Sequence, residues 1–139
     1  MARGVQGLEK LRAKLRALPA ETKRQLREAL DHNADELVAM QKRLAPRGPT
    51  GNLIRSIQKR DGEHELQIKV GAGGPLTTKP VRNGATVEFD YSGAVEFGTS
   101  DTAAKPFFFP SYRALRRRMR GRTSRATSKA AKAVAKGGK

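Results

Sequence analysis

The residues of this sequence that could do chemistry are two histidines and a small set of acidic side chains, since cysteine is absent. His32 lies beside an apolar stripe of a helical segment, and His64 lies in a predicted turn. A metal site or an acid–base pair needs partners that converge on one point, and neither histidine has a second ligand at metal-binding spacing. We therefore expect both to be ordinary surface residues. Without cysteine there is no thiolate metal site, disulfide or cysteine nucleophile.

Most acidic residues are explained without catalysis. Asp31, Asp35 and Glu36 share a helical segment with lysines and arginines, so ion pairs four residues apart account for them. Glu88 and Asp90 alternate with apolar residues of a predicted strand, which places their side chains toward solvent.

Glu96 is the exception, because it stands between Val95 and Phe97 in an aromatic stretch. We expect its carboxylate either to cap backbone N–H groups or to pair with an arginine across a subunit contact. A catalytic acid would need a second carboxylate or a histidine nearby, and the sequence offers none. The prediction is therefore no enzyme, no cofactor and no metal.

Residues 91–110 hold four of the five phenylalanines and one of the two tyrosines. So much ring surface in a chain without tryptophan must be core, interface or both. We expect Tyr91, Val95 and Phe97 to be mostly core, and the three successive phenylalanines to position the last helix and contact a neighbouring subunit. The candidate interface residues are Tyr91, Val95, Glu96, Phe97, Phe107, Phe108 and Phe109.

Two amphipathic helices are predicted at the N-terminal side. The first has leucines spaced 3-4-3 and ends at Pro19: Leu8, Leu11, Leu15 and Leu18. The second ends at Pro46 and carries a heptad-like stripe with one polar member: Leu26, Leu30, Asn33, Leu37, Met40 and Leu44. Packing of this stripe on a sheet is the ordinary interpretation, and a helix–helix contact with another subunit is the alternative.

Two prolines and two glycines make the start of segment 46–57 a rigid loop. Thr50 or Asn52 can cap a short helix there that buries Leu53 and Ile57. The two glycines do not indicate a phosphate-binding loop, because neither a Gly-Lys-Ser/Thr sequence nor a preceding strand accompanies them.

A small antiparallel sheet is predicted after this loop. Apolar residues alternate with polar ones in Leu66–Val70 and in Thr86–Tyr91. Residues 71–84 are rich in glycine and proline and predict an exposed loop joining the two strands as a hairpin. The predicted fold class is α+β: N-terminal amphipathic helices packed on a small antiparallel sheet, a long inter-strand loop and a C-terminal basic helix.

Composition and charge divide the chain unevenly. Its 139 residues suit one domain, and its hydrophobic fraction of 37% allows only a modest core. The net charge of +16 is distributed as +5 over residues 1–47, zero over 48–112 and +11 over 113–139. We predict one domain at 1–120 and a basic arm at 121–139. No apolar run is long enough for a membrane span or a secretory signal, so we expect a soluble protein made in the cytoplasm.

The basic end has two interpretations. It could contact phosphates of nucleic acid without reading sequence, or it could be a solvated tail or meet an acidic protein surface. Base stacking is not expected, because Tyr112 is the sole aromatic residue there. The candidate contacts are Arg113, Arg116, Arg117, Arg118, Arg120, Arg122 and Arg125.

Three segments together resemble a known family. They are Pro46–Leu53 followed by Ser56-Ile57, then Tyr91 followed by Val95-Glu96-Phe97-Gly98-Thr99, and Pro106-Phe107-Phe108 with Pro110. In this order, after amphipathic helices, they resemble the head–tail joining or tail-completion proteins of long-tailed bacteriophages. The resemblance covers about residues 4–120 and implies a small α+β domain that assembles as a ring at the neck or tail top, without enzymatic activity.

The expected function is therefore a structural virion protein in a ring at the head–tail junction. The resemblance implies as partners further copies of the chain, with a hexamer favoured, the head-closure or connector protein, and the tail terminator or tail tube protein. Passing DNA is a further candidate partner, through phosphate contacts. The alternative is a small basic ribosomal or nucleoid-type nucleic-acid binder, and a small hydrolase or nuclease is disfavoured by the missing acid–base cluster.

Overall fold

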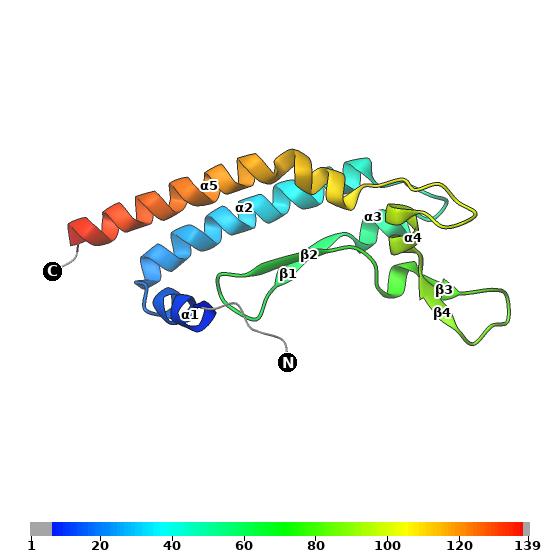
Figure 1. Cartoon of the computed structure of the whole chain (residues 1–139), viewed down its shortest axis with the longest axis horizontal. Coiled ribbons are helices and arrows are strands. Elements are labelled where there is room, and N and C mark those ends of the chain that lie inside the picture. Colours follow the sequence, from blue (N-terminus) through cyan, green and yellow to red (C-terminus); the bar gives the residue numbers. More distant parts are fainter. Residues whose placement is uncertain (1–6, 138–139) are drawn as a thin grey trace.

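A long central helix, α2, organises the computed structural model, which describes residues 7–137. Helix α5 runs antiparallel along one side of α2, and a hairpin of strands β1 and β2 lies along another (Figure 1). The elements in chain order are α1 (Leu8–Arg16), α2 (Ala20–Leu44), α3 (Asn52–Ser56), β1 (Gln58–Asp61), β2 (Ile68–Gly71), η1 (Pro75–Thr77), β3 (Thr78–Pro80), β4 (Glu88–Asp90), α4 (Tyr91–Phe97) and α5 (Phe108–Gly137). The α+β class is confirmed.

The helical predictions for the N-terminal side are confirmed. Pro19 separates α1 from α2, and α2 ends just before Ala45 and Pro46. Leu8 and Leu11 of α1 are 36% and 52% exposed, so this part of the apolar face of α1 is not covered within the chain. The side chain of Leu15 lies outside the described residues.

The polar member of the α2 stripe explains what the stripe packs against. Asn33 is buried, and its Nδ2 donates to the Met119 carbonyl at 3.3 Å and to Thr123 Oγ1 at 3.0 Å. Its Oδ1 accepts from Arg122 Nη1 at 2.7 Å. Asn33 therefore contacts α5 of the same chain, a partner not predicted for the stripe, while α2 also packs on strands β1 and β2. Contact of the stripe with another subunit stays a prediction.

Helix α5 continues as one helix through the boundary predicted at residue 121. A segment of alanine, lysine and serine does not bury enough surface to order itself. Here α2 supplies the surface: Ala130 is 2% exposed. The division into a domain and an arm stays a prediction, while the helix crosses it without a break. The side chain of Val134 lies outside the described residues.

The predicted strand pairing is wrong. Strand β2 pairs with β1, with Gln58 opposite Gly71, and β4 pairs with β3, with Thr78 opposite Asp90. The structure thus has two separate antiparallel hairpins instead of one sheet across a long loop. The segment 71–84, predicted to be irregular, contains η1 and β3.

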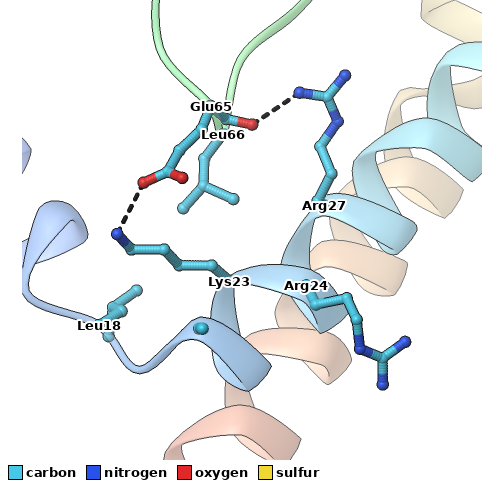
Figure 2. A pocket seen from close by; sticks show the side chains of 7 residues that line it. Leu18, Lys23, Arg24, Arg27, Glu65 and Leu66 are labelled. Atoms are coloured by element: carbon cyan, nitrogen blue, oxygen red, sulfur yellow. Dashed lines mark hydrogen bonds and ion pairs between the residues drawn. The ribbon is translucent and has the colours of Figure 1, made fainter.

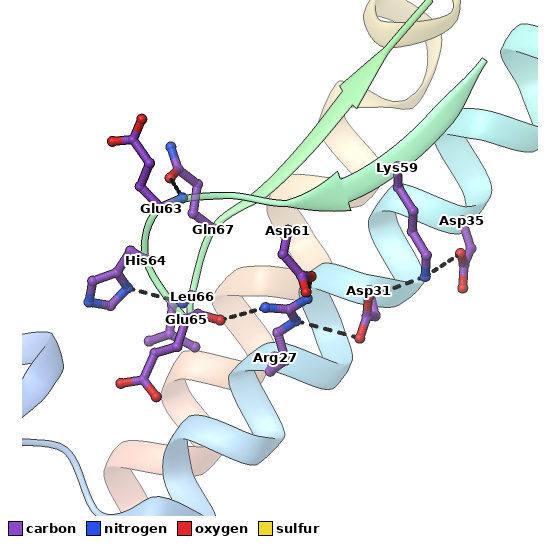
Figure 3. A network of polar contacts seen from close by, with 10 residues as sticks. All are labelled: Arg27, Asp31, Asp35, Lys59, Asp61, Glu63, His64, Glu65, Leu66 and Gln67. Atoms are coloured by element: carbon purple, nitrogen blue, oxygen red, sulfur yellow. Dashed lines mark hydrogen bonds and ion pairs between the residues drawn. The ribbon is translucent and has the colours of Figure 1, made fainter. Parts of the chain in front are cut away.

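Ion pairs tie the β1–β2 hairpin to α2. Arg27 donates to the Glu65 carbonyl at 2.7 Å and pairs with Asp61, and Lys59 Nζ lies 2.6 Å from Asp35 Oδ1 and 3.2 Å from Asp31 Oδ1 (Figure 3). Of the three acids predicted to pair four residues apart within their helix, Asp31 does so, with Arg27 at 3.6 Å. The prediction is wrong for Asp35 and Glu36, which pair with Lys59 of β1 and with arginines of α5.

The hollow between the β1–β2 turn and the start of α2 lies where these two elements bind each other. Lys23 Nζ lies 2.7 Å from Glu65 Oε1, and Leu18 and Leu66 line the same space (Figure 2). Since Lys23 and Arg27 already bind the turn of the hairpin, the hollow offers no convergent set of free groups.

The core forms where α3 meets α2 and the start of α5. Leu53 and Ile57 are 4% and 1% exposed, as the sequence predicts, and they pack with Ala45 and Phe107. The predicted side-chain capping by Thr50 or Asn52 is wrong, because the N-cap of α3 is Gly51, and Thr50 Oγ1 accepts from the Asn52 N–H at 3.3 Å only as a turn contact before the helix.

Gln41 of α2 is a buried polar residue whose amide is not hydrogen-bonded within residues 7–137. Its side chain is fully buried, and neither Nε2 nor Oε1 has a hydrogen-bond partner among the residues described. A buried amide without partners costs about 1–3 kcal/mol. We expect Gln41→Met, which keeps the shape and removes the polar atoms, to raise the free energy of unfolding by about 1 kcal/mol in urea denaturation.

Asn33→Leu is the contrasting variant, because the Asn33 amide is fully bonded. It should lower the free energy of unfolding by about 1–3 kcal/mol. Equal losses in the two variants would mean that the Gln41 amide is bonded in the folded protein.

Candidate interaction site

The Glu96 carboxylate caps the start of helix α5. Its Oε2 accepts from the backbone N–H groups of Phe107 and Phe108 at 2.7 and 2.9 Å, and its Oε1 accepts from that of Phe109 at 3.0 Å. Pro110 has no N–H, so these contacts account for all the donors that a helix start leaves unpaired here. The capping role predicted for Glu96 is confirmed.

The electrostatics of this contact favour the charged carboxylate. Burial acts to raise the pKa of Glu96, but the three backbone N–H groups and nearby Arg113 together hold that pKa below its ordinary value. A negative charge at a helix N-terminus is also stabilised by the helix dipole.

Gly98 turns the chain out of α4 and closes the loop that leads to this cap. Its φ of 77° is left-handed, and a Cβ there would lie 2.8 Å from the Ala104 backbone nitrogen. The Lys105 N–H donates to the Val95 carbonyl at 2.8 Å. The segment from Val95 to Thr99 therefore works as a clip that holds α4 against the start of α5.

The aromatic residues divide differently from the prediction. Phe107, expected at a subunit contact, is 1% exposed and belongs to the core of its own chain, whereas Phe97, expected in the core, is 70% exposed. Tyr91 and Val95 pack against the core as predicted, and Phe108 is half-buried against it. The reason is that Tyr91–Phe97 is a helix rather than a strand end, so Val95 and Phe97 point different ways.

Phe97 and Phe109 form an exposed aromatic surface. Phe109 is 44% exposed, and the two ring centroids lie 5.9 Å apart. Both rings line a hollow, together with Ala72, Gly93 and the other two phenylalanines of the 107–109 run. Its lining is mainly apolar, which suits a hydrophobic side chain from another molecule.

A second apolar surface, which the sequence did not predict, lies on the β3–β4 hairpin. Val81, Val87 and Phe89 are 52%, 65% and 42% exposed. The hairpin projects from the body of the molecule (Figure 1). The alternation of Val87 and Phe89 with Glu88 and Asp90 indicates one apolar face of the strand, but it does not show that this face is left uncovered.

Asp90 fixes the base of this hairpin, although the sequence predicted only a solvent-facing carboxylate. It accepts from the Gly74 N–H at 2.7 Å, from Thr77 Oγ1 at 2.6 Å and from the Ser92 N–H at 2.9 Å. Partial burial acts to raise the pKa of Asp90, but these donors outweigh it and lower the pKa to about 2.

The predicted arginine contacts separate into two groups. Arg118 Nη1 lies 2.6 Å from Glu36 Oε1, and Arg122 Nη1 lies 3.0 Å from Glu36 Oε2, so both bind α2 of their own chain. Hydrogen bonds from Arg118 and Arg122 lower the pKa of Glu36. The remaining candidates are exposed: Arg113, Arg116, Arg117, Arg120 and Arg125.

The two histidines lie apart. His32 is exposed on α2, and His64 Nδ1 accepts from the Leu66 N–H at 3.0 Å within the hairpin turn. Within residues 7–137, no three metal-ligating side chains gather at one point, and no helix combines the length and apolar composition that a membrane span requires.

Comparison with known proteins gives one match. Residues 9–98 match the HK97-gp10-like family model, described as "Bacteriophage HK97-gp10, putative tail-component". The match includes the clip up to Gly98 and ends before the three successive phenylalanines. Searches of curated proteins and of solved structures found no match.

The cap predicts an acid-sensitive fold. Because the pKa of folded Glu96 lies below the ordinary 4.5, the unfolded chain binds the proton first, and stability is lost as pH falls below about 4.5. We expect Glu96→Gln to lower the free energy of unfolding at pH 7 by about 1.5–3 kcal/mol, since hydrogen bonds to a charged group are replaced by neutral ones. Denaturation of both proteins between pH 7 and pH 3 tests this, and the variant should lose less stability on acidification.

Glu88→Gln is the matched control, because Glu88 is exposed on β4. It should change the free energy of unfolding by less than about 0.5 kcal/mol. Parallel acid profiles for wild type and Glu96→Gln would contradict the assignment of the acid loss to Glu96.

Proposed function

Because the chain belongs to the HK97-gp10-like bacteriophage family, we propose that it is a structural virion protein that forms a ring at the head–tail junction. The ring joins the head connector to the tail. No catalytic role is proposed, in keeping with a structural family.

The observation that carries the proposal is the exposed pair Phe97 and Phe109 beside an apolar hollow. Large rings exposed together at the edge of a hollow mark a protein–protein contact rather than ordinary surface. The clip holds both rings in place, because Glu96 joins the helix that carries Phe97 to the helix that carries Phe109.

The projecting β3–β4 hairpin supports a second contact. Its strands are three residues long, and an isolated two-stranded hairpin is marginally stable without neighbours. It also exposes Val87 and Phe89. Two different apolar surfaces on one small chain suit head-to-tail contacts, which build a finite ring when the rotation between subunits closes.

The proposed partners follow from this position. Further copies of the chain form the ring, for which we favour a hexamer. The head-closure or connector protein binds one face of the ring, and the tail terminator or tail tube protein binds the other.

Phe97→Ser should impair assembly without unfolding the chain. Phe97 is mostly exposed, so we expect the free energy of unfolding to change by less than about 1 kcal/mol. Loss of an interface ring should weaken subunit association at least about tenfold. Light scattering after size exclusion and negative-stain imaging measure the assembly, and urea denaturation measures the stability.

Phe107→Ser is the control for a ring used inside the subunit. We expect it to destabilise the fold by about 3–5 kcal/mol, as for large-to-small changes in a core. The proposal is wrong if the wild-type chain stays a strict monomer that never joins phage tails or connectors, or if Phe97→Ser assembles normally.

A further inference from the structure

The C-terminal half of α5 carries a continuous line of positive charge. Four exposed basic residues follow one another with 4-3-4 spacing, which places them on one side of the helix, and we name them the basic stripe: Arg125, Lys129, Lys132 and Lys136. The sequence contains no acidic residue after Asp101, so no charge on α5 itself offsets the stripe.

The basic stripe begins one turn after the last arginine of α5 that pairs with an acidic residue of α2. Arg118 and Arg122 continue the same line toward the N-terminus of α5, and both are bound to Glu36. Successive turns of α2 beyond Glu36 on that side carry His32, Ala29 and Gln25. The next turn carries Glu21, whose carboxylate is bound by Arg24 and Gln25 of its own helix. Among residues 7–137, no carboxylate pairs with the basic stripe.

The surface around the stripe suits phosphate better than protein. A shallow hollow there is lined by the stripe together with Ser124, Ser128 and Ala133. Serine hydroxyls donate hydrogen bonds to anionic oxygens. Protein interfaces are enriched in aromatic residues and depleted of lysine, and this hollow has the opposite composition.

We propose that the basic stripe binds the phosphate backbone of double-stranded DNA. The stripe runs from Arg125 to Lys136 along α5, a rise of about 16 Å, over which a duplex presents on the order of nine charges. Without aromatic side chains the surface does not stack bases, which favours an intact duplex and contacts that do not read sequence. The inference rests on α5 and not on ring formation.

The test is a salt titration of binding between the full-length chain and a 5′-labelled random duplex of about 30 base pairs, followed by fluorescence anisotropy. Two phosphate contacts contribute about 1.8 to the slope of log K against log salt. The double variant Lys129→Gln with Lys132→Gln should therefore reduce the slope by about 1.8 and weaken binding at least about tenfold at about 0.1 M salt.

The matched control is Arg116→Gln with Arg120→Gln, which removes the same charge from the opposite side of α5. It should reduce the affinity by much less than the stripe variant does. Ser128→Glu is an independent variant that places a negative charge in the hollow, and it should also weaken binding. Circular dichroism confirms that each variant is helical.

Three results would overturn the proposal. The first is absence of duplex binding, and the second is an equal loss of duplex affinity in the stripe variant and the control. The third is competition by polyglutamate that is as effective as competition by DNA of equal charge, which would indicate an acidic protein partner. Size exclusion of the same samples separates this proposal from ring formation. A stripe variant that assembles but does not bind DNA supports the DNA-binding proposal. A wild-type chain that stays monomeric and binds DNA through the basic stripe contradicts only the proposal of a ring.

Discussion

The contact between the Glu96 carboxylate and the first turn of α5 sets the arrangement of the whole molecule. It satisfies the donors of three successive residues with one side chain and places a negative charge at the positive end of a 30-residue helix. A long helix fixed at its start has its direction determined as well. From this point α5 runs back along α2, where Asn33 and Glu36 hold it.

The most specific part of the family resemblance is thereby explained as structure. In Val95-Glu96-Phe97-Gly98-Thr99, the glutamate caps α5 and the glycine takes a left-handed turn that leaves no space for a side chain. Phe97 is the large apolar side chain of the motif that is exposed, at 70%. The motif is therefore a clip that presents one ring, and the absence of an acid–base partner for Glu96 in the sequence agrees with that use.

Local signals predicted local structure well. Proline positions and the spacing of apolar residues located α1, α2 and α3. The apolar neighbours of Glu96 indicated a special role, and capping was one of the two roles that they left open. Strand pairing failed because Gln58–Asp61 is exposed throughout and shows no alternation, so the partner of β2 carries no apolar signal. The predictions for Phe97 and Phe107 were wrong in opposite directions, since Phe97 is exposed and Phe107 is buried. A run of aromatic residues does not show which ring faces the core until the start of each helix is known. The order of residues 122–137 depends on α2, a partner about 90 residues away that composition alone does not disclose.

The ion pairs that join the β1–β2 hairpin to α2 are partly exposed, with Asp61 79% and Glu65 54% exposed at the side chain, and the apolar residues Ile68 and Val70 of the hairpin are only half-buried. Such pairs contribute on the order of 0–1 kcal/mol each and are screened by salt. We therefore expect the hairpin to have low local stability, to open without unfolding of the rest of the protein, and to exchange its amide hydrogens with solvent before α2 does. In an assembly, the β1–β2 hairpin could then shift to fit a neighbouring molecule while helices α2 and α5 and the clip keep their positions.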